Sequence, residues 1–153
     1  MKELKIIEVK SEIGAGTRGA SLGVEAMKIA SLDMNSDFFK QYESVEVENV
    51  NELLFDGARH SYAKFIDGVM IMEERVCLEV YETVWEEDFP LIMAGDHSTA
   101  YGTISGIKKA NPKKRIGVIF ILYNTNCRIV NHILPLIYQP LKSLFISLLQ
   151  LHN

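Results

Sequence analysis

Short apolar runs alternate with segments of helical periodicity along residues 1–121 of this 153-residue chain. Strands are expected at residues 4–9, 45–47, 90–94 and 115–121, and helices at residues 20–31, 60–85 and 99–109. Strands that are continuously apolar and alternate with helices form parallel sheets covered on both faces. The sequence therefore predicts an α/β fold, a three-layer parallel sheet with helices on both faces.

Two of the expected helices carry an apolar stripe, because residues three or four apart share one side of a helix. In the first helix the stripe consists of Leu22, Ala26, Ile29 and Ala30. In the long helix it consists of Phe65, Val69, Met72, Val76 and Val80. Trp85 and Phe89 are expected in the core or at its edge.

The stretch Gly95-Asp96-His97-Ser98 follows an expected strand and opens an expected helix. Ligands of parallel α/β folds collect beyond the carboxyl ends of the strands, and an imidazole placed there can hold a metal ion. Asp96 or Ser98 can instead cap the helix by accepting hydrogen bonds from its free N–H groups. His97 is thus a candidate metal ligand, although a dinuclear site needs further ligands from other loops.

Two segments of the chain resemble the arginase, or ureohydrolase, family. Residues 11–23 (SEIGAGTRGASLG) look like the N-terminal loop and first helix of that family, and residues 91–98 (LIMAGDHS) look like its first metal motif. Ala94 replaces a glycine that family members usually carry. The resemblance covers residues 1–121 and implies a hydrolase of guanidino compounds that converts arginine to ornithine and urea. It also implies that His97 is a ligand of one of two manganese ions.

The second metal motif of the family, Asp-Ala-His-x-Asp, should directly follow the expected strand that ends at Ile121. Residues 122–126 are instead Leu-Tyr-Asn-Thr-Asn, which supply neither carboxylate nor imidazole. A later Asp-x-Asp pair and the substrate-binding residues of the family would lie beyond Asn153. His97 is the one ligand of the family's six that remains. We therefore expect a truncated arginase-like chain that is inactive as it stands, with at most a weak partial manganese site.

The composition changes abruptly at Leu122. All 20 acidic residues and all 10 glycines lie before this position, and the remaining residues include no Asp, Glu, Gly or Ala. We interpret residues 1–121 as an arginase-like α/β portion and residues 122–153 as an atypical apolar tail, either a non-native extension or a genuine divergent tail. Its prolines argue against an integral membrane span, whereas its exposed apolar residues favour self-association into a homo-oligomer.

Two other functions stay open. The chain could be a non-catalytic fragment that acts through self-association or by binding an intact homologue. The loop at residues 14–19 also spells G-x-G-x-x-G, which can bind a dinucleotide phosphate. Four residues separate this loop from the preceding strand, however, and Asp33 and Asp37 follow a helix rather than ending a strand, so a dinucleotide site is the less favoured alternative.

Bulk properties exclude some partners. A net charge of −4 disfavours nucleic acid, and two cysteines do not make a disulfide framework. Polar residues near the N-terminus interrupt any signal peptide, so a cytoplasmic location is expected. His60, at the start of the long helix, is expected to cap it or to be solvated. Glu73, Glu74, Glu86, Glu87 and Asp88 are expected on solvated surface.

Overall fold

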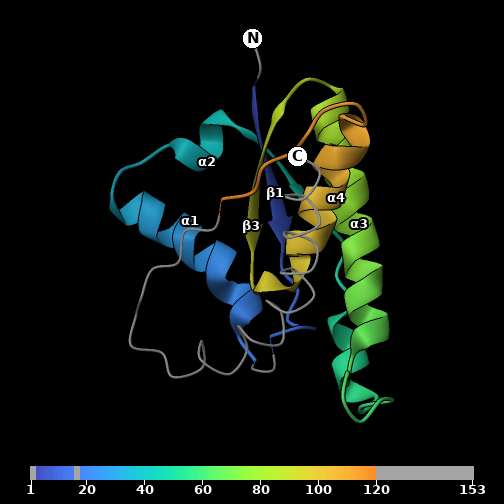
Figure 1. Ribbon diagram of the computed structural model, residues 1–153. Helices are drawn as coiled ribbons and strands as arrows, with labels where there is room; N and C mark the ends of the chain where they lie inside the picture. Colours follow the sequence, from blue (N-terminus) through green and yellow to red (C-terminus); the bar gives the residue numbers. More distant parts are fainter. Residues whose placement is uncertain (1–2, 16–17, 120–153) are drawn as a thin grey trace. The chain divides into compact units, whose positions relative to one another are not determined.

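The computed structural model describes residues 3–15 and 18–119 (Figure 1). The chain divides after Ile116 into two units, and the fold described here is that of the first. Its elements in chain order are β1 (Leu4–Val9), η1 (Ala20–Leu22), α1 (Gly23–Asp33), α2 (Phe38–Gln41), β2 (Glu43–Glu46), η2 (Asn51–Phe55), α3 (Ile66–Trp85), β3 (Phe89–Ala94), η3 (His97–Thr99) and α4 (Ala100–Ala110). The tail interpreted at residues 122–153 lies outside the described residues.

The sheet in the described residues has three parallel strands in the order β2-β1-β3. Strand β1 is central, since Ile7 lies opposite Val45 of β2 on one side and Ile92 of β3 on the other. Helices α1 and α2 lie on one side of this sheet, and α3 and α4 lie on the other (Figure 1). This arrangement confirms the predicted three-layer α/β fold.

The main core lies between β1 and α3. Ile7 and Val9 of β1 pack with Met72, Val76 and Val80, which recur every four residues along α3. All five side chains are buried, and Phe65 and Val69 extend the same cluster as partly buried side chains. The predicted stripe of the long helix is therefore confirmed, because a spacing of four residues keeps side chains on one helix face.

The apolar stripe of the first helix is exposed and lies away from the sheet. Leu22 and Ile29 are 65% and 62% exposed, and Val24 is the buried residue of α1. The side of α1 that meets the sheet is defined by Val24 and Lys28, whose ammonium reaches Glu8 on β1. The apolar stripe is real but does not face this sheet.

Three other expectations need correction. Trp85 and Phe89 are 69% and 60% exposed rather than part of the core, since both lie at the turn between α3 and β3. Helix α3 begins at Ile66 instead of His60, because the polar segment before it is irregular and exposed. Residues 115–119 form no strand, and residues 120 and 121 of the expected strand lie outside the described residues.

No helix in the described segments is both long enough and apolar enough to cross a membrane.

Candidate functional site at the ends of β1 and β3

The loops that follow β1 and β3 are neighbours. Val9 lies opposite Ala94 at the ends of the two strands, and the N–H of Gly95 donates a hydrogen bond of 3.1 Å to the carbonyl oxygen of Val9. Since parallel strands end at the same edge of a sheet, both loops are placed where α/β proteins bind their ligands. The two segments that resemble the arginase family are thereby brought together.

Glycines allow these loops to touch. A Cβ atom on Gly14 would lie 2.6 Å from the Cβ atom of Ser98, and one on Gly95 would lie 2.7 Å from the carbonyl oxygen of Ser11. Both distances are shorter than non-bonded atoms tolerate. A side chain at either position would therefore separate the loop after β1 from the loop that carries His97.

Asp96 supplies the cap that the sequence assigned to either Asp96 or Ser98. Its Oδ1 atom accepts hydrogen bonds from the backbone N–H of Ser98, at 2.8 Å, and from the Ser98 hydroxyl. Its Oδ2 atom is buried and has no hydrogen-bond partner in the part of the chain that is described. Asp96 therefore fixes the turn around His97 and retains one carboxylate oxygen that is free to accept a further donor or ligand.

His97 is the first residue of η3, and its side chain is exposed. Over residues 3–15 and 18–119, no three or more His, Cys, Asp or Glu side chains are grouped so that they could hold a metal ion. A manganese pair needs several imidazole and carboxylate ligands, since this hard ion prefers oxygen donors. The described residues alone do not fit such a pair, and positions 122–126 lie outside them.

Glu73 was expected on solvated surface, which is wrong. This partly buried α3 residue accepts a hydrogen bond from the backbone N–H of Gly102, in the first turn of α4. Burial raises the pKa of the Glu73 carboxyl, the Gly102 hydrogen bond lowers it, and the nearby Asp96 charge raises it; the net shift is upward. Glu73 thus joins α3 to the helix that follows the His97 loop.

One sequence signal for this contact is the glycine pair in α4. A Cβ atom on Gly102 would lie 2.5 Å from the carbonyl oxygen of Glu73, and one on Gly106 would lie 2.6 Å from that of Cys77. Glycines four residues apart share one helix face and allow two helices to approach closely. This spacing could have shown which side of α4 meets α3, although not which side chain caps it.

Glu12 lies just before the glycine-rich loop at residues 14–19 and binds its far end. Its Oε1 atom accepts hydrogen bonds from the backbone N–H groups of Gly19, at 2.7 Å, and Ser21, at 3.2 Å, and from the Ser21 hydroxyl. These bonds, above all the one from the Ser21 side chain, lower the pKa of Glu12. A bound pyrophosphate would meet this carboxylate, so the geometry disfavours a dinucleotide site.

His60, the other histidine of the described residues, does not belong to the His97 loop or to the loop after β1. It is in the exposed segment before α3, and its Nε2 atom is 3.6 Å from Oδ2 of Asp67. The expectation of a solvated side chain agrees with this position.

The fold and the site define an α/β domain with a histidine loop at the carboxyl end of a parallel strand. Residues 2–121 match the model of the arginase family. The chain therefore belongs to the arginase family. It is 28% identical over 122 residues to an arginase of Brevibacillus brevis, covering 77% of this chain and 39% of that protein. It is 30% identical over 120 residues to an arginase of Emericella nidulans, covering 71% and 37%.

Solved structures give the same fold. The crystal structure of arginase from Bacillus subtilis superimposes with a TM-score of 0.53 at 24% identity, covering 71% of this chain and 34% of that one. A second structure of the same enzyme, at 1.7 Å resolution, gives a TM-score of 0.53 at 25% identity and covers 35% of that chain. The chain thus spans roughly two fifths of the length of the curated relatives above and about a third of the solved arginases.

Proposed function

We propose that this chain carries one part of an arginase-type manganese hydrolase, the part that supplies His97, and that the chain as it stands does not hydrolyse guanidino compounds. Its parent reaction would be the conversion of arginine to ornithine and urea. The observation that carries the proposal is that Asp96 fixes the His97 loop while residues 3–15 and 18–119 supply too few ligands around it.

The chemistry supports both halves of this proposal. Bound manganese would supply activated water for attack on a guanidinium carbon, and this chemistry would require anionic ligands that hold the ions in place. His97 offers one imidazole, while the Oδ1 atom of Asp96 is already engaged by Ser98. We further propose that residues 1–121 are the arginase-like portion, that residues 122–153 are foreign to it, and that the protein is cytoplasmic.

A metal titration tests the proposal directly. The purified chain is mixed with Mn²⁺, free and bound metal are separated, and urea release from arginine is measured with an intact arginase as the positive control. We expect weak binding, further reduced by His97→Ala, and no urea. Two tightly bound ions per chain, or urea production that His97→Ala abolishes, would contradict the proposal.

A non-catalytic role is supported by a different observation. Leu22 at the end of η1 and Ile29 and Leu32 on α1 are exposed, and their apolar surface has no covering element in the described residues. Strand β3 also has an open edge, because among the described strands it pairs with β1 alone. Exposed apolar surface and open strand edges both favour association. The second candidate is therefore a fragment that binds itself or an intact homologue.

Sedimentation of the chain, alone and mixed with an intact arginase, distinguishes self-association from binding to a homologue. Association is expected to weaken when Ile29→Lys places a charge in the α1 stripe, whereas Lys114→Gln should leave it unchanged. A monomer at every concentration, with no complex in the mixture, would rule out the second candidate.

A further inference from the structure

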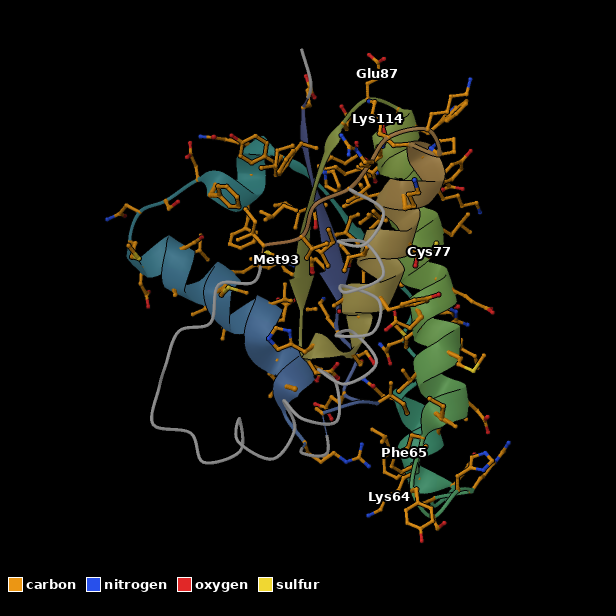
Figure 2. All side chains as sticks on the ribbon, viewed as in Figure 1. Lys64, Phe65, Cys77, Glu87, Met93 and Lys114 are labelled. Atoms are coloured by element: carbon orange, nitrogen blue, oxygen red, sulfur yellow. The ribbon has the colours of Figure 1, made fainter. Side chains whose placement is uncertain are left out.

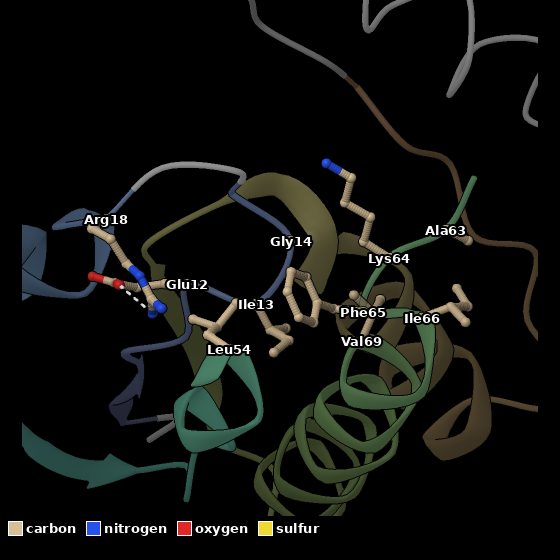
Figure 3. Close-up of a pocket in the computed structure, with 10 residues that line it drawn as sticks. All are labelled: Glu12, Ile13, Gly14, Arg18, Leu54, Ala63, Lys64, Phe65, Ile66 and Val69. Atoms are coloured by element: carbon tan, nitrogen blue, oxygen red, sulfur yellow. Dashed lines mark ion pairs between the residues drawn. The ribbon is translucent and has the colours of Figure 1, made fainter. Parts of the chain in front are cut away.

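A cavity of about 420 Å³ opens beside the loop after β1 and does not include His97 (Figure 3). Its walls come from three regions: residues 12–14 and 18 after β1, Leu54 of η2, and residues 63–66 and 69, which lie just before α3 and in its first turn. The apolar lining includes Ile13, Leu54, Phe65 and Val69. Figure 3 shows the Phe65 ring between Ile13 and Lys64, with Arg18 on the far side of the hollow.

Two of the three charged side chains around this cavity, Glu12 and Arg18, have partners within the described residues. Glu12 is held by Ser21 and Gly19, as described above, and Arg18 lies 3.8 Å from Oε2 of Glu12. The Arg18 guanidinium also lies over the Phe55 ring, 5.2 Å from its centroid. These two opposite charges largely compensate each other locally, so neither dominates the field in the cavity.

Lys64 is the charge that remains. Its side chain is exposed, and its ammonium has no ion pair or hydrogen bond to any residue in the described ranges. It is adjacent in sequence to Phe65, which lines the same cavity. An unpaired cation beside apolar side chains is complementary to a ligand with one anionic group and an apolar body.

We propose that this cavity binds a small carboxylate with an apolar tail, with the carboxylate at Lys64 and the tail against Ile13, Leu54 and Phe65. The cavity volume is enough for a ligand of one ring or a short alkyl chain. A purely polar ligand would leave the apolar lining without partners. A second anionic group directed into the cavity would approach Glu12.

The probe is 4-phenylbutyrate, and the reference probe is 4-phenylbutan-1-ol, which has the same apolar body without the charge. Binding to the full chain is followed through the methyl resonances of Ile13, Leu54 and Val69. We expect saturable shifts of these methyls with phenylbutyrate and weaker binding of the alcohol. Acetate should bind least, because each buried methylene strengthens binding by up to about fourfold.

Lys64→Gln tests the charge. Because Lys64 is exposed, this change should leave the fold intact and weaken phenylbutyrate binding about fivefold, with no effect on the alcohol. The matched control is Lys114→Gln, which removes the same charge from the segment that follows α4, far from Lys64 (Figure 2). Added salt should weaken phenylbutyrate binding to the parent protein in the same way, because it screens the charge of Lys64.

Two results would overturn the proposal. The first is equal weakening of phenylbutyrate binding by Lys64→Gln and Lys114→Gln, because the effect would then reflect net charge. The second is a set of phenylbutyrate shifts that leave the Ile13, Leu54 and Val69 methyls unmoved, since the ligand would then lie elsewhere.

Discussion

Gly14 leaves the space that Ser98 fills: a Cβ atom on Gly14 would lie 2.6 Å from the Cβ atom of Ser98 and 2.7 Å from its hydroxyl oxygen. The loop after β1 therefore packs directly on the turn that holds His97. Since Asp96 binds the same Ser98 through its Oδ1 atom, a displacement of Ser98 disturbs the helix cap as well.

Gly14→Ala is therefore expected to lower the free energy of unfolding by about 1–3 kcal/mol, the usual effect of forcing an extra methyl into a packed site. Chemical denaturation followed by far-UV circular dichroism measures this loss. The His97 ring resonances should shift at the same time, because the turn that contains His97 must move.

Gly23→Ala is the matched control. A Cβ atom at Gly23 would have open space around it, and its backbone has helical angles of φ −58° and ψ −41°. Alanine should then leave stability unchanged or raise it by up to about 1 kcal/mol, since alanine loses less backbone entropy in a helix. An equal loss in both variants would show that the contact with Ser98 has no special weight.

Three of the four expected strands and most of the long helix could be predicted because their signals are local. Residues 4–9 form β1 as expected, and Met72, Val76 and Val80 recur at a spacing that fixes one face of α3. The glycine before Asp96 and the cap at Asp96 also follow from neighbouring residues. The position of His97 at the end of a parallel strand was accordingly predictable.

The contacts of the first helix, Glu73 and Glu12 could not be predicted, because they depend on residues that are distant in sequence. The stripe of Leu22 and Ile29 has helical periodicity, but periodicity does not tell which side of α1 meets the sheet. Glu73 faces a helix that begins 27 residues later, and a glutamate beside Glu74 in a helical segment resembles solvated surface. From sequence alone, Glu12 cannot be told from an ordinary solvated loop residue, because its contacts with Gly19 and Ser21 form only in the fold.

Glu8 provides a test of stability at acid pH. It is 3% exposed, and hydrogen bonds from Lys28, at 2.8 Å, Ser44 and Lys10 surround it. Burial alone would raise the pKa of this carboxyl, but the three bonds together outweigh burial and hold its pKa below 4.5. The charged form is therefore favoured more in the folded protein than in the unfolded chain.

Because the folded pKa of Glu8 is lowered, its contribution to stability is present above pH 4.5 and is lost as the pH falls through the folded value. Glu8→Gln should lower the free energy of unfolding at pH 7 by about 1–3 kcal/mol and flatten the acid limb of the stability profile. Urea denaturation at a series of pH values measures both. Glu43→Gln, at a side chain that is 75% exposed, should leave the profile close to the parent's.

Glu73→Gln should change the free energy of unfolding at neutral pH in the opposite direction to Glu8→Gln. The raised pKa means that the folded protein favours protonated Glu73, so the carboxylate has a cost above pH 4.5 that disappears as the pH falls below this value. Glutamine resembles the protonated form and retains an oxygen for the Gly102 N–H. We expect the variant to be at least as stable as the parent at neutral pH and equal to it near pH 3, measured by denaturant unfolding.

Glu74→Gln, at the exposed neighbouring position, is the control for a general change in net charge. It should leave the unfolding free energy at neutral pH within about 0.5 kcal/mol of the parent value. A clear loss of stability in Glu73→Gln alone would mean that the Gly102 bond needs the full negative charge.

Removal of residues 122–153 tests their proposed foreign origin. This segment has no acidic residue to oppose association, and its leucines and isoleucines are a sequence pattern that favours aggregation. If residues 1–121 carry the α/β fold by themselves, the shortened chain should keep its helical circular dichroism signal and scatter less light at high concentration. A cooperative loss of the helical signal would instead show that the segment contributes to the folded core, and the interpretation of residues 122–153 as a non-native extension would be wrong.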